Sequence, residues 1–564
     1  MNKKRTVLTL VTLLVFGAII ALHYIRPNIF EYFRFRGGGG GGGTALPEGW
    51  VSVKDHGGVG DARVVTDAAM TSGSAVLTSA TAAFTSADVG KSVSINGVGV
   101  SGGILQTTIS GFTNSTTVTL AATAGTTASS QYCAFGTDNT SAAQAAIAAA
   151  SSTVFFPVGN YFFAGSIGAL PVSISLVGAN QFGPTWIPWP LSGNPLDLGG
   201  TILLLTANAG NGSGTKFISA SSNSAIIGFT FYWPNQVTTN STAIPYPWAI
   251  YQYFGSACSV KYCAFVNAYQ AIYAEYQVAA LFEEIRGEAL YRGIQLEGNN
   301  SVTRLRGVYF DDEWGRGTNI DNWRQGNSIA FNLGRNDGTI LEDCFCFNYH
   351  TWIHFYDDAA HGGSSWAQIR GGGADGCGIP IQIDQAQMQG IDIDGVWITL
   401  NAIGVANTFA GDLRIHNSMF FCPGGQFGSV DGSGDVTVDN CDFVCGNSLT
   451  PPTLSTTGWT VSGTGNFTLR NCVFHVIQPC NVSLGASLIG AIVVGNMSSD
   501  TAFHITNNLG VAAVIGNNTG GENHAQTLYI GADLRLVPIT GGGKLQARNP
   551  GTNTWADVDQ WTNP

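Results

Sequence analysis

Charged residues are scarce in this sequence of 564 residues, and basic residues are the scarcer kind. Lys and Arg number 24 and Asp and Glu number 36, so charged residues make up 11% of the chain. Six of the basic residues but only one acidic residue lie before residue 44, which leaves 18 basic against 35 acidic residues in the remainder. Nucleic acids and anionic lipid surfaces bind to basic surfaces. The composition therefore excludes both as partners of the main body.

Spacings typical of metal sites are missing as well. The 11 cysteines include the pairs Cys344 and Cys346, and Cys441 and Cys445, but neither pair has the further His or Cys partners of a zinc site. The segment Asp431–Asp435 lacks the ligand set and the closing Glu of a calcium loop. We therefore predict no metal and no cofactor. Most cysteines are expected to be small apolar core residues. One disulfide is allowed by the sequence, which does not choose the pair.

Glycine, in contrast, is abundant, with 75 residues. Together with the low charge and the many Ser, Thr, Asn and Ala residues, this composition is typical of a turn-rich, all-β solenoid. Long helices are not expected. Solenoids grow by adding coils, so the length of the chain favours one long core over several compact domains.

A short phrase recurs along the chain and indicates such coils. It begins with a small or amide residue in most copies, continues with a mostly apolar one, and has an aromatic or apolar residue two positions later. The copies are Gly228-Phe229-Thr230-Phe231, Tyr262-Cys263-Ala264-Phe265, Gly307-Val308-Tyr309-Phe310, Asp343-Cys344-Phe345-Cys346, Gly395-Val396-Trp397-Ile398, Asn417-Ser418-Met419-Phe420, Asn440-Cys441-Asp442-Phe443 and Asn471-Cys472-Val473-Phe474.

The alternation within each copy has period 2, which places Cys441 and Phe443 on one strand face and Asp442 on the other. Asn417, Asn440 and Asn471 would then lie one above another at a bend, with their amides bonding along the stack. Coils of this kind bury their apolar faces only against their neighbours. We predict a right-handed parallel β-helix over residues 170–520. An ordinary β-sandwich with coincidental Asn-Cys pairs is the alternative.

A second alternating run follows the phrase in many coils and carries the candidate functional residues. Its members are Ile272-Tyr273-Ala274-Glu275, Ile294-Gln295-Leu296-Glu297, Ile329-Ala330-Phe331-Asn332, Ile353-His354-Phe355-Tyr356, Ile381-Gln382-Ile383-Asp384 and Ile403-Gly404-Val405-Ala406. With the isoleucines facing inward, two columns face outward. One is predicted to hold Tyr273, Gln295, His354 and Gln382, and the other Glu275, Glu297, Asn332, Tyr356 and Asp384.

The amino terminus predicts membrane attachment. Thr6 to Ile25 is a nearly continuous apolar run of about membrane-spanning length, preceded by Lys3, Lys4 and Arg5. We interpret residues 1–36 as a signal anchor with the amino end inside and the body in the periplasm or outside the cell. A cleaved signal peptide is the alternative, although no clear small-x-small site closes the run. Residues 37–49, which include seven consecutive glycines, form a flexible linker.

Residues 50–169 carry a pattern that an insertion divides. The first half includes Lys54-Asp55-His56-Gly57-Gly58-Val59-Gly60-Asp61 and Thr66-Asp67, and the second includes Asp138-Asn139-Thr140-Ser141-Ala142-Ala143-Gln144-Ala145-Ala146-Ile147 and Phe156-Pro157-Val158-Gly159-Asn160-Tyr161. This pattern resembles the N-terminal cap of the pectate-lyase superfamily, which includes polygalacturonase-like enzymes and viral tailspikes. Ala142–Ala150 predicts a short helix, capped by Thr140 or Ser141, that covers the open end of the first coil. Residues 68–136 predict a small inserted β module, with strands near 76–78 and 116–120.

The resemblance implies a parallel β-helix and a carbohydrate ligand, but that superfamily includes hydrolases, lyases and proteins that only bind. The Asn-Thr-Asp, Asp-Asp and Gly-His-Gly motifs of the polygalacturonase-like branch are missing from their expected positions. Residues 521–564 leave the coil rhythm and predict a small terminal β unit. Related tailspikes form trimers, so a homotrimer is one possibility.

Paired carboxyl groups are the candidates for catalysis. Glycoside hydrolysis needs two of them, about 5 Å apart for retention and about 6.5–9.5 Å for inversion. Glu275 and Glu297 lie one coil apart, at a strand spacing of about 4.8 Å. Asp384, some three coils further, is a third candidate that would pair with Asp357 or Asp358 if their loop folds back.

Saccharide binding is expected from the polar and aromatic side chains along the same strip. The candidates are Tyr273, Gln295, Asn332, His354, Tyr356, Asp357, Asp358, Trp314 and Arg292. The sequence thus predicts a protein that acts on a polysaccharide, with glycoside hydrolysis as the favoured activity. A glycan-binding adhesin or tailspike-like protein is the alternative. A polysaccharide lyase, which would use the arginines at 292, 304, 306, 316 and 324, is a further one.

Overall fold

The computed structural model describes residues 46–564 apart from short gaps. The gaps are 181–190, 192, 363–365, 385–386, 401–402, 408–410, 423–425, 446–456, 477–479, 499–502, 510–512, 517, 521–527, 530–533, 540–541, 550–553 and 563–564. The predicted anchor and residues 37–45 of the predicted linker lie outside the described residues. Within the described part, no helix has both the length and the apolar character needed to cross a membrane.

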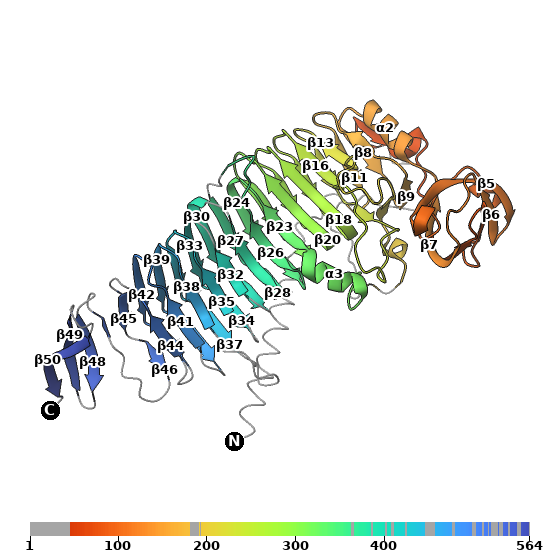
Figure 1. The fold of residues 1–564 in the computed structure, drawn as a ribbon. Helices are drawn as coiled ribbons and strands as arrows, with labels where there is room; N and C mark the ends of the chain where they lie inside the picture. Colours follow the sequence, from red (N-terminus) through yellow and green to blue (C-terminus); the bar gives the residue numbers. More distant parts are fainter. Residues whose placement is uncertain are drawn as a thin grey trace, which may run out of the picture. The chain divides into compact units, whose positions relative to one another are not determined.

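The body is a parallel β-helix, as predicted, in which each full coil contributes strands to three parallel ladders (Figure 1). Ladder A is a sheet of 15 strands. It consists of β1 (Trp50–Ser52), β8 (Thr153–Phe156), β11 (Ser175–Gly178), β14 (Ala225–Ile227), β17 (Ser259–Lys261), β19 (Leu281–Glu283), β21 (Thr303–Arg306), β24 (Asp337–Glu342), β27 (Trp366–Arg370), β30 (Gln387–Asp394), β33 (Gly411–His416), β36 (Val436–Asp439), β39 (Asn466–Arg470), β42 (Gly490–Val494) and β45 (Ala513–Gly516).

Ladder B follows the turn after ladder A. It consists of β9 (Gly159–Phe163), β12 (Thr201–Leu205), β15 (Thr230–Tyr232), the first halves of β18 (Ala264–Glu275) and β20 (Arg286–Glu297), β22 (Tyr309–Phe310), β25 (Phe345–Phe347), β28 (Gly373–Cys377), β31 (Trp397–Leu400), β34 (Met419–Cys422), β37 (Asp442–Cys445), β40 (Val473–Val476), β43 (Met497–Ser498) and β46 (Thr519–Gly520).

Ladder C carries the predicted functional strip. It consists of β10 (Gly168–Ala169), β13 (Ile218–Ala220), β16 (Ile250–Tyr253), the second halves of β18 and β20, β23 (Ile329–Leu333), β26 (Thr351–Phe355), β29 (Ile379–Ile383), β32 (Ile403–Asn407), β35 (Gln426–Val430), β38 (Thr457–Val461), β41 (Cys480–Leu484) and β44 (Phe503–Asn507). Because β18 and β20 are 12 residues long and pass through both ladders, B and C join into one sheet of 25 strands.

A left-handed residue makes the turn from ladder A to ladder B. The residues at this turn are Gly228, Tyr262, Glu284, Gly307, Asp343, Gly371, Gly395, Asn417, Asn440, Asn471 and Gly495, and all have positive φ. Gly and Asn adopt this conformation at the least cost, which explains why the repeated phrase begins with a small or amide residue in most coils. Glu284, Gly371 and Gly495 are further members that the phrase did not reveal.

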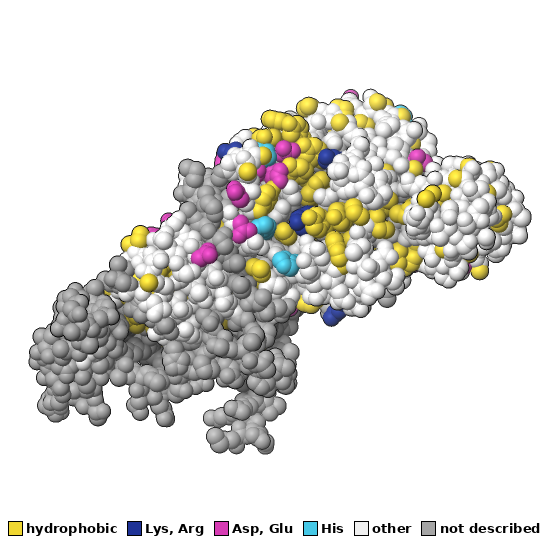
Figure 2. Space-filling view, viewed as in Figure 1, with side chains coloured by type: hydrophobic (Ala, Val, Ile, Leu, Met, Phe, Trp, Pro, Cys, Tyr) yellow, Lys and Arg dark blue, Asp and Glu magenta, His cyan; other side chains and the backbone are white. Residues whose placement is uncertain are grey.

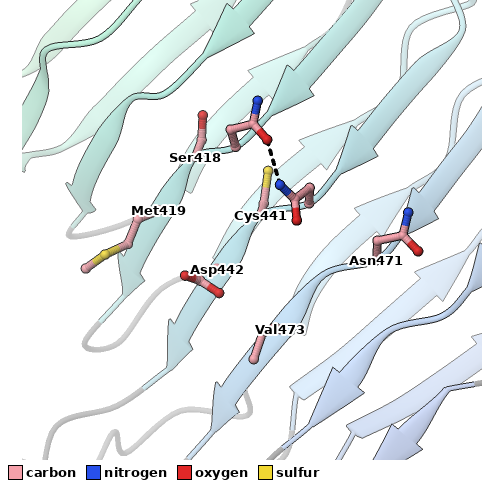
Figure 3. Close-up of a pocket in the computed structure, with 8 residues that line it drawn as sticks. Ser418, Met419, Cys441, Asp442, Asn471 and Val473 are labelled. Atoms are coloured by element: carbon pink, nitrogen blue, oxygen red, sulfur yellow. Dashed lines mark hydrogen bonds between the residues drawn. The ribbon is translucent and has the colours of Figure 1, made fainter.

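The asparagines of this turn stack as predicted (Figure 3). Asn440 Nδ2 donates to Asn417 Oδ1 at 2.6 Å across one coil of 23 residues. Asn417 Nδ2 donates to Asp394 Oδ1 at 2.8 Å, whereas Asn471 Nδ2 donates to Asp439 Oδ1 at 3.1 Å rather than to Asn440. The side-chain bonds therefore link one coil to the next along the outside of the turn.

The inward column of ladder C corrects the predicted phase of two coils. Ile294 pairs with Phe331, and Phe331 pairs with Ile353, so Phe331 rather than Ile329 occupies the core position. In the same way Ile381 pairs with Val405, not with Ile403. Each of these strands has apolar residues at two alternate positions, so the period of 2 could not show which of the two is in register with the core column.

The divided cap pattern comes together in space. Asp61 accepts from Thr137 N at 2.9 Å, and Val59 N donates to Asn139 Oδ1 at 2.7 Å. The expected helix is α2 (Thr140–Ala149), which packs against β1 and β8. Its N-cap is Asn139, so the predicted capping by Thr140 or Ser141 is wrong. The Asp138 carboxylate accepts from Thr140 N at 3.0 Å instead.

The insertion folds as a closed antiparallel barrel of six strands with its own apolar core. It begins at Arg63 rather than at residue 68, so Thr66-Asp67 belongs to the barrel and not to the cap as predicted. Its strands are β2 (Arg63–Met70), β3 (Val76–Thr78), β4 (Ser92–Ile95), β5 (Leu105–Asn114), β6 (Thr117–Leu120) and β7 (Ala128–Gly136). Short 3-10 helices lie at η2 (Val53–His56), η3 (Ser86–Asp88), η4 (Val100–Gly102) and η5 (Pro195–Leu198). At the carboxyl end, β47 (Leu528–Tyr529), β48 (Leu534–Ile539), β49 (Gly542–Asn549) and β50 (Thr554–Thr562) form an antiparallel sheet.

Helix α3 (Asn319–Asn327) covers a buried group of charges. Glu288 and Arg324 are fully buried, and Arg324 Nε lies 3.2 Å from Glu288 Oε1. Asp311, Asp312 and Glu313 are also buried. Burial raises the pKa of Glu288 and of Asp311 to about 7, and burial together with the charges of Asp311 and Glu288 raises that of Glu313.

Eight of the cysteines are free and buried, which agrees with the predicted core role. Cys346 Sγ and Cys377 Sγ lie 3.3 Å apart. The side chains of Cys441 and Cys472 also interact, and all four of these cysteines are free thiols.

Replacement of Asn440 should separate its backbone role from its side-chain bond. Asn440→Gly keeps the left-handed turn accessible, so the thermal midpoint should fall only slightly. Asn440→Val forces a β-branched residue into the same conformation at a cost of about 1–2 kcal/mol. A thermal unfolding series should therefore rank the native chain and the Gly variant above the Val variant. Equal midpoints for Gly and Val would contradict the strained turn.

The buried acidic group predicts a pH dependence of stability. Its carboxyl groups have raised pKa values when folded, so the folded state holds extra protons between the ordinary pKa and about 7. The stability that these protonated carboxyl groups contribute is fully present below their ordinary pKa values and is lost as the pH rises through about 7. We expect Glu313→Gln to narrow the difference in thermal midpoint between pH 5 and pH 8, and the exposed control Glu342→Gln to leave it unchanged.

Candidate functional site

The outer side of ladder C carries two polar columns on neighbouring coils. Strand register places Tyr251, Tyr273, Gln295, Asn332, His354 and Gln382 in the first column. Tyr253, Glu275 and Glu297 lie in register in the second column, and Gly334, Tyr356 and Asp384 follow the paired ends of the next strands. Asn332 was predicted for the second column, which is wrong because Phe331 rather than Ile329 faces the core. Gly334 occupies the second-column position that was predicted for Asn332.

Glu297 accepts three side-chain hydrogen bonds on this surface. Its Oε2 accepts from the Tyr273 hydroxyl, and its Oε1 accepts from the Tyr356 hydroxyl and from Gln295 Nε2, the last at 2.6 Å. Asn332 Nδ2 in turn donates to Gln295 Oε1 at 3.1 Å. These bonds hold the Glu297 carboxylate in one orientation.

The tyrosines around the two glutamates remain hydrogen-bond donors. Burial, and then the bond to Glu297, raises the pKa of Tyr273 and Tyr356 far above 10. Tyr251 donates to Glu275 Oε2 at 2.6 Å, and the same two causes raise its pKa. Each donor therefore keeps its proton at any ordinary working pH.

Gly334 creates the space through which Tyr356 reaches Glu297. A Cβ at position 334 would lie 2.7 Å from Asp358 Oδ2 and 2.9 Å from the Tyr356 hydroxyl. Glu297 and Tyr356 belong to coils that are two apart, with the coil of Gly334 between them. The missing side chain thus allows contact across an intervening coil.

His361 links a buried aspartate to Glu275. Both oxygens of Asp358 face His361 Nδ1, at 2.7 and 2.8 Å, and Asp358 also accepts from the backbone N–H of Arg335 at 3.1 Å. The other ring nitrogen, Nε2, lies 3.6 Å from Glu275 Oε1. The side chains of His361 and Asp358 are 7% and 5% exposed. Asp358 therefore orients the imidazole toward Glu275.

Glu297, Asp358 and His361 also bring potential metal ligands together. One atom from each lies within 4.8 Å of the other two. Both Asp358 oxygens already face His361, however, and Glu297 already accepts three hydrogen bonds. The contacts among the three describe a hydrogen-bonded cluster, and we do not propose a metal there.

A second polar group lies further along ladder C. Asp384 Oδ2 lies 2.9 Å from His354 Nε2 and accepts from Gln382 Nε2 at 2.6 Å. Burial lowers the pKa of His354, although Asp384 opposes the shift. Register places Asp384 three coils from Glu297. Asp384 thus belongs to a separate group, and Asp358, its suggested partner, binds His361.

The remaining candidates are dispersed. Trp314 is partly buried and packs against apolar residues near α3, which include Leu290 and Ile320. Arg292 lies 3.7 Å from the Tyr291 ring centroid and donates to the carbonyls of Tyr291 and Asn327. Asp357 is exposed and directly precedes the buried Asp358.

The arginines proposed for a lyase do not share one surface. Arg324 belongs to α3, and its side chain is fully buried against Glu288. Arg304 and Arg306 lie on β21 of ladder A, where Arg306 pairs with Glu283. The sequence placed these residues close together along the chain, but the coil distributes them over different faces.

Two functional candidates were missed from the sequence. Tyr251 stands one coil before Tyr273, and Ile250, which precedes it, extends the isoleucine series by one coil. His361 lies in a loop three residues after Asp358, and an Asp-x-x-His spacing was the available signal. Its contact with Glu275 depends on how the loop returns to the sheet, which no local pattern shows.

Comparisons with known proteins give a fold-level likeness. No protein-family model and no curated protein sequence matches this chain. Among solved structures it is similar to β-helix proteins. The surface adhesin PfbA of Streptococcus pneumoniae is 10% identical, with a TM-score of 0.37 over 75% of this chain and 96% of the adhesin.

Two further structures give similar values. The catalytic domain of a GH87 alpha-1,3-glucanase in complex with nigerose is 12% identical, with a TM-score of 0.37 over 82% of this chain and 91% of that domain. A tailspike of an Acinetobacter phage is 11% identical, with a TM-score of 0.37 over 75% of this chain and 79% of the tailspike. Identities and scores this low assign no activity to the chain.

Gly334→Ala should disturb the Glu297 network directly. The new methyl group would displace Tyr356 or Asp358, so the thermal midpoint should fall. Gly326 in α3 is a matched control, because a Cβ there meets no atom within 4 Å. Gly326→Ala should not lower the midpoint, since Ala favours a helix over Gly. Equal midpoints for the two variants would show that position 334 tolerates a side chain.

Proposed function

We propose that this chain binds and hydrolyses a polysaccharide, with Glu275 and Glu297 as the two reacting carboxyl groups. The observation that carries the proposal is their geometry. They are register partners on β18 and β20, each accepts from a tyrosine hydroxyl of the preceding coil, and both are only partly buried. Two acids held side by side on a surface that substrate can reach are what glycoside hydrolysis needs.

Glu297 suits the role of nucleophile or charge-stabilising partner. Its three hydrogen bonds fix the direction of its oxygens, and positioned charge is most effective where positive charge develops at the anomeric carbon. Gln295 is itself held by Asn332, so the orientation of the carboxylate is supported from a further coil.

Glu275 suits the role of general acid and base. His361 Nε2 lies 3.6 Å from its Oε1, and Asp358 occupies the other ring nitrogen. A proton held between Glu275 and His361 can pass to the leaving oxygen and can later be recovered from water. The spacing of neighbouring strands, about 4.8 Å, is close to the separation of about 5 Å used by retaining enzymes. We therefore expect retention of the anomeric configuration.

Binding without hydrolysis is the second candidate. The contacts that hold Glu297 would equally suit a carboxylate that accepts hydrogen bonds from sugar hydroxyls. A lyase has weaker support, because the arginines that would neutralise an acidic sugar lie on different faces.

The cellular setting is part of the proposal. The apolar run at Thr6–Ile25 and the glycines at 37–43 support a body tethered to a membrane and exposed outside the cytoplasm. A homotrimer remains a prediction. We also propose right-handed winding, as crossovers between parallel strands nearly always adopt.

Hydrolysis is tested by incubating the full chain with neutral and acidic polysaccharides. New reducing ends and unsaturated uronate absorbance are followed together. Reducing ends without unsaturation are expected, and Glu275→Gln and Glu297→Gln should each lower the rate about 10²–10⁴-fold. Asp392→Asn, which removes a carboxylate from ladder A, should leave the rate unchanged.

The outcome separates the alternatives. Unsaturation would replace hydrolysis with a lyase reaction. Retained glycan binding without either signal would leave the protein as a binder. The configuration of the first product, followed by proton NMR, should show retention, and inversion would exclude Glu297 as a nucleophile.

A further inference from the structure

Exposed aromatic rings lie beside the acidic site at the end of ladder C. Tyr253 and Phe254 are 45% and 63% exposed, which is high for side chains of their size. The Phe254 and Tyr276 rings are stacked, with centroids 4.5 Å apart and planes at 13°. Tyr253 meets Phe254 edge-on at 4.5 Å. We call Tyr253, Phe254 and Tyr276 the aromatic platform.

The backbone at the platform is unfavourable for such residues. Phe254 has φ of 46° and Tyr276 has φ of 52°, a left-handed conformation that favours glycine. The N–H of Phe254 bonds to the Glu275 carbonyl and that of Tyr276 to the Glu297 carbonyl, so the two hold equivalent turns of successive coils. The residue that follows Glu297 at the next such turn is Gly298, with φ of 60°. Two aromatic residues thus occupy turns at which glycine would be more stable.

The platform is continuous with the acidic site on two sides. The Tyr276 ring packs edge-on against His361 at 4.8 Å, and His361 faces Glu275. Tyr251, which donates to Glu275, stacks against Tyr253 with centroids 5.6 Å apart. Figure 2 shows hydrophobic side chains, a class that includes tyrosine, next to acidic and histidine side chains on this face of the molecule.

We infer that the aromatic platform is a saccharide subsite that stacks one sugar ring of the polysaccharide next to the ring held at Glu275 and Glu297. Its flat, exposed rings match the apolar face of a pyranose, while the adjoining tyrosine hydroxyls and carboxylates suit the hydroxyl groups on the ring edge. Strain that is kept at an exposed position, beside candidate reacting groups, is typical of a binding site. This inference rests on the proposed function, because it takes the polysaccharide as the ligand.

Phe254→Gly makes a sharp test, because it removes the ring and relieves the backbone. The thermal midpoint of this variant should equal or exceed that of the native chain, so a loss of binding could not come from unfolding. Phe112→Gly on the barrel strand β5 is the control, since Phe112 is also exposed, at 40%. It should leave saccharide binding unchanged.

Binding is measured by affinity electrophoresis of the full chain through gels that contain laminarin, xylan, dextran, mannan or polygalacturonate. Each variant is also made in the Glu297→Gln background, so that the gel polysaccharide is not degraded. At least one probe should retard the Glu297→Gln chain. Phe254→Gly should weaken that retardation about tenfold, whereas Phe112→Gly should not.

The outcomes separate this inference from the proposed hydrolysis. Retardation that is unchanged by Phe254→Gly and by Tyr276→Gly overturns the subsite, even if reducing ends are released. Retardation that Phe254→Gly weakens supports the subsite, even if the native chain releases no reducing ends and hydrolysis fails. Absence of retardation by all five probes overturns the inference.

Discussion

From β14 to β42 the structure depends on one left-handed residue in each coil, at the turn between ladders A and B. The N–H of this residue donates to the backbone carbonyl just before the equivalent residue of the next coil, as from Asn417 to Asp439 at 3.3 Å and from Asn440 to Arg470 at 3.2 Å. Because the bond repeats from coil to coil, it fixes the vertical alignment of the coils. Strand register, and with it the order of side chains in every column, follows from that alignment.

In the candidate site, the alignment of the coils brings residues at a fixed sequence spacing into contact. Tyr251 to Glu275 and Tyr273 to Glu297 are the same contact made one coil apart, each spanning 24 residues of the sequence. A second type of contact breaks this regularity. Tyr356 reaches Glu297 across the coil of Gly334, and His361 reaches Glu275 from a loop. The candidate site thus combines one repeated contact, from tyrosine to glutamate, with two contacts that do not follow the repeat. These two contacts distinguish the coils of the site from the other coils.

The same division explains how much the sequence could predict. The turn residues and the alternation after them obey strong local rules, so the parallel coils and the asparagine stack could be predicted. The sequence could not show which residue lies in the core column where a strand has two apolar residues at alternate positions. Ile329 and Phe331 are an example, because both satisfy the period of 2. The roles of His361 and Gly334 depend on where a loop and an empty position lie in space. Arg324 was predicted to serve an anionic ligand, yet its guanidinium pairs with the buried carboxylates of Glu288 and Asp321.

The barrel inserted into the cap has a consequence for the order of folding. Strand β1 pairs with β8, and Trp50 is the register partner of Thr153, so this first pairing must await synthesis of the whole barrel. Later pairings, such as Ile250 with Ile272, close much shorter loops. The barrel closes on itself and has a separate core, so it can form while the first coil is still incomplete. During that interval β1 presents an unpaired edge to other chains. Aggregation during synthesis should therefore be most sensitive to how quickly the barrel folds.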